Sequence, residues 1–331
     1  MKKLLFFFFV LFVLVFLFKD DISNLITGRT VYEPINEKML PQDFGKLEVY
    51  FCPEDNCENI FVNEIKKSIS VDCAFFDLDL DNITEIIREK QHRLVIDNSN
   101  YKNIKMNFAR SDDRKEFMHN KFCILDNSKV ITGSMNPTRF DAYRNNNNLV
   151  IIESKTMAEN YKDEFDELWS GIFGNGEKVK NQQIYFNGFL VDNYFCPEDN
   201  CELHVIELLK KAQSRIYFMT FSFTSDGIGE EIIRNFYSGV DVRGVFDATQ
   251  AGNKYSEYNK FRKLGIDVRK DGNKGFMHHK VFIVDDTVVL GSYNPTSSGN
   301  TKNDENILIF HDPRITNEFE QEFKRVYENS L

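Results

Sequence analysis

The sequence predicts an α/β protein made of two homologous halves. Each half is expected to be a mixed β-sheet flanked by helices, and the halves are expected to pack about a pseudo-twofold axis with one site at their seam. The repeat carries this prediction, because residues 50–58, YFCPEDNCE, recur unchanged as residues 194–202. Between the repeated segments, short apolar runs alternate with amphipathic ones, an order typical of α/β folds.

The first 19 of the 331 residues are strongly apolar. Lys2 and Lys3 precede an unbroken apolar run over residues 4–18, and Lys19 follows it, which is typical of a secretory signal or an uncleaved signal anchor. As a helix this run would cover about 22 Å of a hydrocarbon core about 30 Å thick. No small-residue cleavage pattern follows, so we expect a retained anchor. The body would then lie outside the cytoplasm, membrane-anchored, or secreted if the leader is cleaved.

The rest of the chain divides into a tether and the two halves. We expect the tether over residues 20–45, half one over residues 46–180 and half two over residues 181–331. In half two, the patterns predict strands at residues 213–223, 240–246, 281–284, 287–290 and 307–310, and helices at residues 228–237 and near the end. Half one shows the same order. It lacks an equivalent of the segment around Asn253 to Ile266.

Two repeated segments carry the candidate chemistry. FMHNK of residues 117–121 returns as FMHHK of residues 276–280, and GSMNPT of residues 133–138 as GSYNPT of residues 291–296. Alternate side chains share one face of a strand, so His119 is expected beside Lys121 and His278 beside Lys280. Neutral histidine is a nucleophile and lysine offsets charge on phosphate oxygens, so each pair suits attack on a phosphodiester.

The pattern His-x-Lys-x4-Asp followed by Gly-Ser-x-Asn resembles the signature of the phospholipase D superfamily, over residues from about 46 to 331. The two copies are His119, Lys121, Asp126, Gly133, Ser134 and Asn136, and His278, Lys280, Asp285, Gly291, Ser292 and Asn294. The resemblance implies that one histidine forms a phosphohistidine and the other is general acid and then general base. By the same resemblance, the lysines and asparagines would bind phosphate oxygens, the serines would give further donors, and no metal or other cofactor is implied.

The acids near these motifs are expected to have different roles. Asp126 and Asp285 lie too far along their strands to reach the phosphate, since the stretch after each histidine extends about 23 Å, so we expect them to be structural. In the family, an acid after the Gly-Ser-x-Asn motif orients a histidine, and Glu305 matches it, whereas half one has Asn147 there. We predict that the histidine paired with Glu305 has the higher pKa. Which histidine it contacts, and which is the nucleophile, stay open.

The cysteines allow three interpretations. Four of the six lie in the repeated CPEDNC segment, as Cys52 and Cys57 and as Cys196 and Cys201. Export favours two short-loop disulfides, although a shared four-cysteine zinc site or unpaired thiols also fit the spacing. Cys73 and Cys123 fall in strand-like segments and are expected to be core thiols.

Charge and the leader bear on the substrate. After Lys19 the chain carries 38 basic and 51 acidic residues, a net charge of −13, which disfavours long polyanions. The tether would place the site near lipid, so a phospholipase D-like hydrolase or transferase acting on phospholipids at a membrane surface is the first hypothesis. The alternatives are an exported nuclease and a non-catalytic scaffold. A nuclease could use the basic groups Lys254, Lys260, Arg262, Lys263, Arg269, Lys270 and Lys274. The duplication removes the need to dimerise, so we expect a monomer.

Overall fold

The computed structural model describes residues 40–101 and 109–331. The expected anchor, residues 1–19, and residues 20–39 of the expected tether lie outside these described residues. Within the described ranges, no helix combines the length and the apolar character needed to cross a membrane.

Half one is built on a seven-stranded sheet with the order β2-β8-β7-β6-β3-β4-β5. The pairs β3–β4 and β4–β5 are parallel and the other pairs are antiparallel. The strands are β2 (Leu47–Cys52), β3 (Ser70–Phe75), β4 (Gln91–Ile96), β5 (Ala109–Ser111), β6 (Lys121–Leu125), β7 (Lys129–Gly133) and β8 (Asn147–Glu153).

Half two repeats this order and adds two strands at one edge. Its sheet runs β1-β9-β10-β16-β15-β14-β11-β12-β13, and the last seven strands correspond to those of half one in sequence order and direction. The strands are β9 (Gln183–Phe186), β10 (Phe189–Cys196), β11 (Arg215–Thr220), β12 (Asp241–Phe246), β13 (Asp267–Lys270), β14 (Lys280–Val284), β15 (Thr287–Gly291) and β16 (Glu305–Phe310). The two matching sheets confirm the predicted α/β class and the duplication.

One strand departs from the expected boundaries. Residues 42 and 43, expected to be the end of the tether, form β1 (Gln42–Asp43), which pairs in parallel with β9. The tether expectation is therefore wrong at its end, because backbone hydrogen bonds fix these residues to the sheet of half two.

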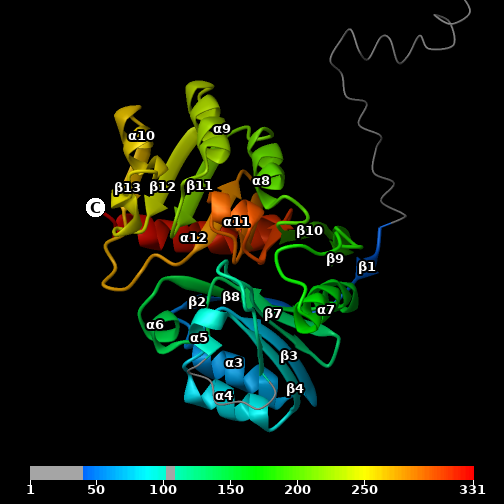
Figure 1. Cartoon of the computed structure of the whole chain (residues 1–331). Coiled ribbons are helices and arrows are strands. Elements are labelled where there is room, and N and C mark those ends of the chain that lie inside the picture. The colour runs from blue at the N-terminus through cyan, green and yellow to red at the C-terminus, as the bar shows by residue number, and fades with distance from the viewer. Residues whose placement is uncertain (1–39, 102–108) are drawn as a thin grey trace, which may run out of the picture. The chain divides into compact units, whose positions relative to one another are not determined.

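The helices form two outer layers and one shared inner layer (Figure 1). α3 and α4 cover the outside of the half-one sheet, and α8, α9 and α10 cover the outside of the half-two sheet. α7 packs on β3, β6 and β7, while α12 packs on β11, β14 and β15 and also contacts β2 of the other half. The helices are α3 (Cys57–Lys66), α4 (Asp81–Arg88), α5 (Asn98–Tyr101), α6 (Arg139–Tyr143), α7 (Lys155–Ser170), α8 (Cys201–Leu209), α9 (Asp226–Tyr237), α10 (Glu257–Lys263), α11 (Ser297–Thr301) and α12 (Pro313–Glu328), with the 3₁₀ helix η2 (Gln250–Gly252).

A single apolar core joins the two halves. It contains buried side chains from both sheets and from α7 and α12. Tyr161 of α7 is fully buried, and its ring centroid lies 5.0 Å from that of Phe122 in half one and 5.0 Å from that of Phe195 in half two. Such edge-to-face contacts stabilise by about 1 kcal/mol each beyond the area they bury. The seam is therefore a close-packed interior, which fixes the relative position of the groups at its edge.

Candidate active site

Each repeated histidine lies just before a central strand of its own sheet. His119 precedes β6 and His278 precedes β14. The backbone N–H of His119 donates to the carbonyl oxygen of Asp304 at 2.9 Å, and that of His278 donates to the carbonyl oxygen of Asn146 at 2.9 Å. Asp304 belongs to half two and Asn146 to half one, so each histidine is held against the opposite half.

Both imidazoles line one cavity of about 610 Å³ at the seam. His119 is 7% exposed and His278 is 9% exposed, so each ring is buried apart from its cavity face. Asn136 and Asn294 of the repeated Gly-Ser-x-Asn motifs line the same cavity. The fold therefore brings four of the predicted site residues, two from each half, to one place.

Each imidazole also receives a partner from the opposite half. Nδ1 of His119 lies 2.8 Å from Oε2 of Glu305, and Nδ1 of His278 lies 3.0 Å from Oδ1 of Asn147. The sequence left open whether Glu305 contacts the histidine of its own half, and the structure shows that it crosses to His119. An acceptor at Nδ1 favours the tautomer with the proton on that nitrogen, which leaves the Nε2 lone pair for the cavity side.

Asp141 is a site residue that the sequence reasoning missed. It lies on α6, is 3% exposed, and its Oδ2 lies 3.3 Å from Nδ1 of His278. The same oxygen accepts hydrogen bonds from the backbone N–H and the side-chain amide of Asn136, at 2.6 Å and 2.8 Å. Half two has Gly299 at the corresponding position, so the repeat gives no indication of this acid. The available signal was an unmatched aspartate shortly after the Gly-Ser-x-Asn motif.

The prediction that the histidine paired with Glu305 has the higher pKa depends on an ionised Glu305, and burial disfavours that form. Burial, followed by the charge of the motif lysines, lowers the pKa of His119 well below its ordinary value. Burial also lowers the pKa of His278, but Asp141 opposes that decrease. Burial raises the pKa of Glu305 itself to about 8, so at neutral pH this acid gives the protonated form of His119 less support than an ionised carboxylate would.

The motif lysines lie against the backbone of their histidines. Both are 2% exposed. The ammonium of Lys121 donates to the carbonyl oxygen of His119 at 2.6 Å, and that of Lys280 donates to the carbonyl oxygen of His278 at 2.8 Å. Burial lowers the pKa of Lys121 to about 8 and that of Lys280 to about 7. A bound phosphate would raise both pKa values, because its negative charge favours the ammonium form.

The asparagines and serines of the motifs occupy different environments. Oδ1 of Asn136 and Oδ1 of Asn294 are buried without a hydrogen-bond partner among the described residues. Ser134 and Ser292 do not line the cavity. The hydroxyl of Ser292 donates to Oε2 of Glu305 at 2.8 Å, so this serine supports the acid instead of facing a phosphate.

The motif aspartates lie at turns and do not line the cavity. Asp126 accepts hydrogen bonds from the backbone N–H of Ser70 at 2.8 Å and from its hydroxyl at 3.2 Å. Asp285 accepts the equivalent bonds from Ser214 at 2.9 Å and 2.7 Å. Each aspartate thereby joins the turn after its strand to the beginning of a neighbouring strand.

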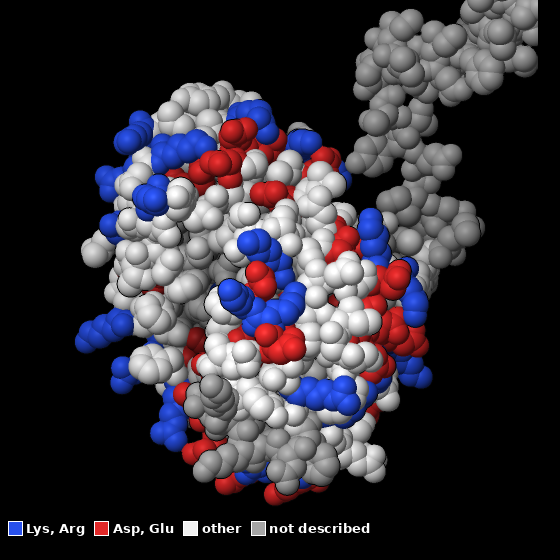
Figure 2. Space-filling view, in the orientation of Figure 1, with Lys and Arg blue, Asp and Glu red and all other residues white. Residues whose placement is uncertain are grey.

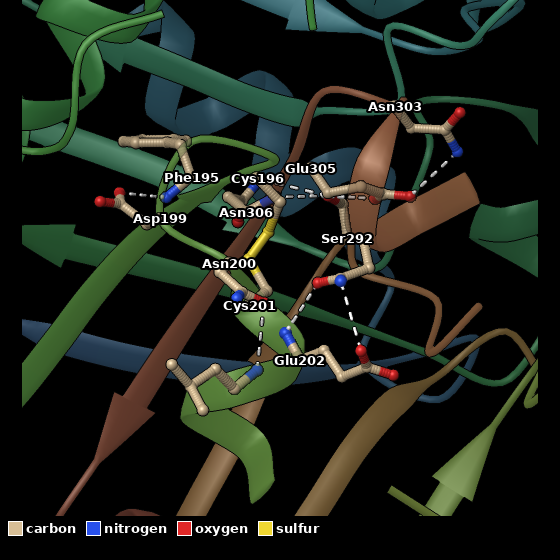
Figure 3. Close-up of a disulfide and its surroundings, with 12 residues drawn as sticks. Phe195, Cys196, Asp199, Asn200, Cys201, Glu202, Ser292, Asn303, Glu305 and Asn306 are labelled. Carbon is tan, nitrogen blue, oxygen red and sulfur yellow. Dashed lines mark hydrogen bonds between the residues drawn. A yellow bond between two sulfur atoms is a disulfide. The ribbon is translucent and has the colours of Figure 1, made fainter. Parts of the chain in front are cut away.

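The repeated cysteine pairs are disulfides, Cys52–Cys57 and Cys196–Cys201. In the sheets, Cys52 lies opposite Asn147 and Cys196 lies opposite Glu305. Each disulfide turn therefore adjoins the residue that contacts a histidine of the other half. Figure 3 shows the second turn, with its sulfur–sulfur bond beside Glu305 and Ser292.

The expectation for the remaining cysteines is wrong. Cys73 on β3 lies opposite Cys123 on β6, and the two form a third disulfide. With all six cysteines paired, the zinc-site and unpaired-thiol alternatives are also wrong. Over residues 40–101 and 109–331, no cluster of histidine, cysteine, aspartate and glutamate side chains is arranged to hold a metal ion.

Comparison with known proteins identifies relatives of this arrangement. The family model described as "Cardiolipin synthase, PLD-like domain" matches residues 77–169 and 205–327, one segment in each half. The mitochondrial cardiolipin hydrolase of Chlamydomonas reinhardtii is 32% identical over 142 residues, 40% of this chain and 64% of that protein. The human mitochondrial cardiolipin hydrolase is 35% identical over 125 residues, 38% of this chain and 50% of that protein. This chain thus spans less than two thirds of the length of either relative.

A solved structure resembles the whole body. The phosphatidylserine synthase of Haemophilus influenzae superposes with a TM-score of 0.64 at 15% identity, covering 87% of this chain and 88% of that one. At this identity the likeness concerns the fold, and it extends over both halves.

Proposed function

Because the chain belongs to the phospholipase D superfamily, we propose that it is a phosphodiesterase that hydrolyses phospholipids or transfers their head groups through a phosphohistidine. The observation that carries the proposal is the single cavity lined by His119 and His278, each with a hydrogen-bond partner from the other half. Two imidazoles at one phosphorus can divide nucleophilic attack and proton transfer between them.

The reaction would proceed in two displacements. In the first, Nε2 of one histidine bonds to phosphorus, the bond from phosphorus to the leaving oxygen breaks, and the other imidazolium gives that oxygen its proton. In the second, the now neutral imidazole takes a proton from water, the water oxygen bonds to phosphorus, and the nitrogen–phosphorus bond breaks. An alcohol in place of water gives head-group transfer. Lys121 and Lys280 would offset the charge on the non-bridging oxygens.

The mouth of the cavity supports a lipid substrate. Phe117, Phe140 and Phe276 line the cavity and are 43%, 56% and 42% exposed. Exposed aromatic side chains beside a phosphate site favour a substrate or surface with apolar groups. The apolar run over residues 4–18 would hold the body at a membrane, outside the cytoplasm.

One surface feature favours a nuclease as the second candidate. Lysine and arginine side chains gather over α10 and β13, whereas acids and bases mix over the rest of the face that Figure 2 shows. Lys260, Arg262 and Lys263 lie in the last turn of α10, within the segment that half one lacks. A nucleic acid held by such contacts would bind less tightly as the salt concentration rises. Its binding constant would fall roughly as the inverse first power of the salt concentration for each phosphate contacted.

A comparison of substrates and variants tests the proposal. The full chain, His119→Ala and His278→Ala are assayed on vesicles of phosphatidylcholine, vesicles of cardiolipin, and single-stranded DNA. We expect hydrolysis of lipid and a loss of at least about a thousandfold in each variant, since each histidine acts at the phosphorus. His311→Ala is the matched control, because His311 contacts Asp192 and Thr287 away from the cavity. The two-histidine mechanism is wrong if His119→Ala or His278→Ala retains the activity of this control. Cleavage of DNA but not lipid would favour the nuclease.

A further inference from the structure

We propose that Asp141 positions His278 and stabilises its protonated form, in place of the acid that half one lacks at position 147. The inference rests on the proposed two-histidine reaction, and it adds a positioning residue to that site. The inference begins from the contact between Asp141 and His278, which has no equivalent in the other half of the repeat. The Asp141 carboxylate and the Asn147 amide oxygen share one nitrogen, Nδ1 of His278, at 3.3 Å and 3.0 Å.

The two halves place their acids differently. Asp141 corresponds to Gly299 in half two, and Asn147 corresponds to Glu305. A Cβ atom on Gly299 would lie 2.3 Å from the backbone oxygen of Asn294, so half two has no space for a side chain there. In half one the acid is Asp141 on α6, whereas in half two it is Glu305 on β16. Each half therefore supplies one carboxylate to the opposite histidine, from a different element.

The Asp141 carboxylate is held in place by several donors. One oxygen accepts from both N–H groups of Asn136, and the other accepts from the side-chain amide of Asn145 at 2.5 Å. The Asp141 backbone N–H donates to the hydroxyl of Thr138, which caps α6. A carboxylate fixed by this many donors can orient an imidazole without itself turning away. The same contacts link His278 to Asn136, which lines the cavity.

The charges around His278 require such a counter-charge. The ionisable groups that influence it are Asp141 on α6, Lys280 on β14, Lys121 on β6 and His119 across the cavity. Burial alone would raise the pKa of Asp141, but the contact with His278 holds it well below its usual value, so the carboxylate is ionised. An ionised acid favours the imidazolium form, so His278 would give the proton to the leaving oxygen in the first displacement and His119 would attack.

Moving the acid between the two positions tests the proposal. The variants are Asp141→Asn, Asn147→Glu and the double variant Asp141→Asn/Asn147→Glu, each in the full chain. Asp79→Asn is the matched control, because Asp79 accepts a hydrogen bond from the backbone of Arg139 at the start of α6 and is exposed. The measurements are kcat and its pH profile with a soluble phosphodiester, the titration of His278 by NMR, and the melting temperature.

We expect Asp141→Asn to lower kcat about ten- to a hundredfold and to move the alkaline limb of the pH profile and the His278 titration to lower pH by about one unit or more. The double variant should recover most of the lost kcat and most of the shift in the His278 titration. Its new acid stands at position 147, which corresponds to Glu305 in half two. Asn147→Glu alone should move the His278 titration to higher pH. It removes the hydrogen bond from the Asn147 amide to the backbone carbonyl oxygen of Asp141, but it leaves the donors to the Asp141 carboxylate in place. The control should change none of these.

The outcomes separate this proposal from the proposed function. If the wild type is active and His278→Ala is not, but Asp141→Asn retains the wild-type pH profile and His278 titration, the role of Asp141 is refuted and the two-histidine reaction stands. A lower melting temperature with an unchanged His278 titration would make Asp141 purely structural. Should Asp141→Asn fail to fold, an unchanged His278 titration in Asn147→Glu would refute the proposal instead. A wild type inactive on every phosphodiester would overturn the proposed function, while the titrations would still report on Asp141.

Discussion

At the scale of single residues, the site is a group of buried cations that a bound anion would balance. The ammonium groups of Lys121 and Lys280 are both 2% exposed, and burial is the main reason that their pKa values are lowered, to about 8 and about 7. A phosphodiester carries a negative charge, and cations removed from water attract it more strongly than exposed ones. If the proposed function is right, we expect the site to bind anions best when both lysines are protonated.

This arrangement predicts that anion affinity falls as the pH rises. Sulfate is a suitable probe because its charge does not change over the range. Between about pH 7 and about pH 9, Lys280 and then Lys121 lose protons, and Glu305, with a pKa of about 8, becomes negative, so the dissociation constant should rise by roughly tenfold per pH unit or more. Isothermal titration calorimetry measures the dissociation constant.

Lys280→Met should bind sulfate more weakly and with a shallower pH dependence. Lys210→Met is the control, because Lys210 is an exposed residue that contacts Glu207. A wild-type affinity that stays constant over this range would contradict the assignment of the buried lysines as anion-binding groups.

At the scale of elements, the strand ends that carry the motif glycines set the position of Glu305. Gly291 ends β15 with a φ of 144°, and the next residue, Ser292, donates to Glu305. A Cβ atom on Gly291 would lie 2.2 Å from the backbone oxygen of Asn306. Glycine is thus required both for the backbone angle and for the close approach of β16.

We expect Gly291→Ala to lower the free energy of unfolding by about 3 kcal/mol, from the strained φ and the clash with Asn306 together. Gly188→Ala is the matched control, because Gly188 has a φ of 88° but no atom within 4 Å of its added Cβ. It should lose only about 1 kcal/mol, from the backbone angle. Urea denaturation measures both. Equal losses in the two variants would show that the contact with β16 contributes nothing.

The sequence predicted the helices and strands better than it predicted the contacts between residues of different segments. The repeat and the alternation of strand and helix located both sheets, because these are local patterns that the second copy reinforces. The contact of Glu305 with His119 could not be predicted, since it depends on which segment crosses the seam. The Cys73–Cys123 disulfide depends on the register of β3 against β6, which only the folded sheet defines. Asp141 was missed because Gly299 gives it no counterpart.

At the scale of the whole molecule, the two halves depend on each other. His119 contacts Glu305 of half two, and His278 contacts Asn147 and Asp141 of half one. The apolar core is also shared, with α7 and α12 between the sheets. Separating the halves would remove a partner from each histidine and expose apolar surface on both pieces. The covalent link near residue 180, by contrast, contributes no group to the cavity.

Inserting a protease site after Lys178, an exposed position near the end of half one, tests this dependence. Cleaved protein whose halves stay together should keep the proposed phosphodiesterase activity, because every contact at the seam survives. Halves separated in denaturant and refolded apart should each have less than about a hundredth of that activity, since neither holds a complete set of catalytic groups. Mixing them during refolding should restore it. The uncleaved protein with the same insertion is the control, and activity in one isolated half would contradict the shared site.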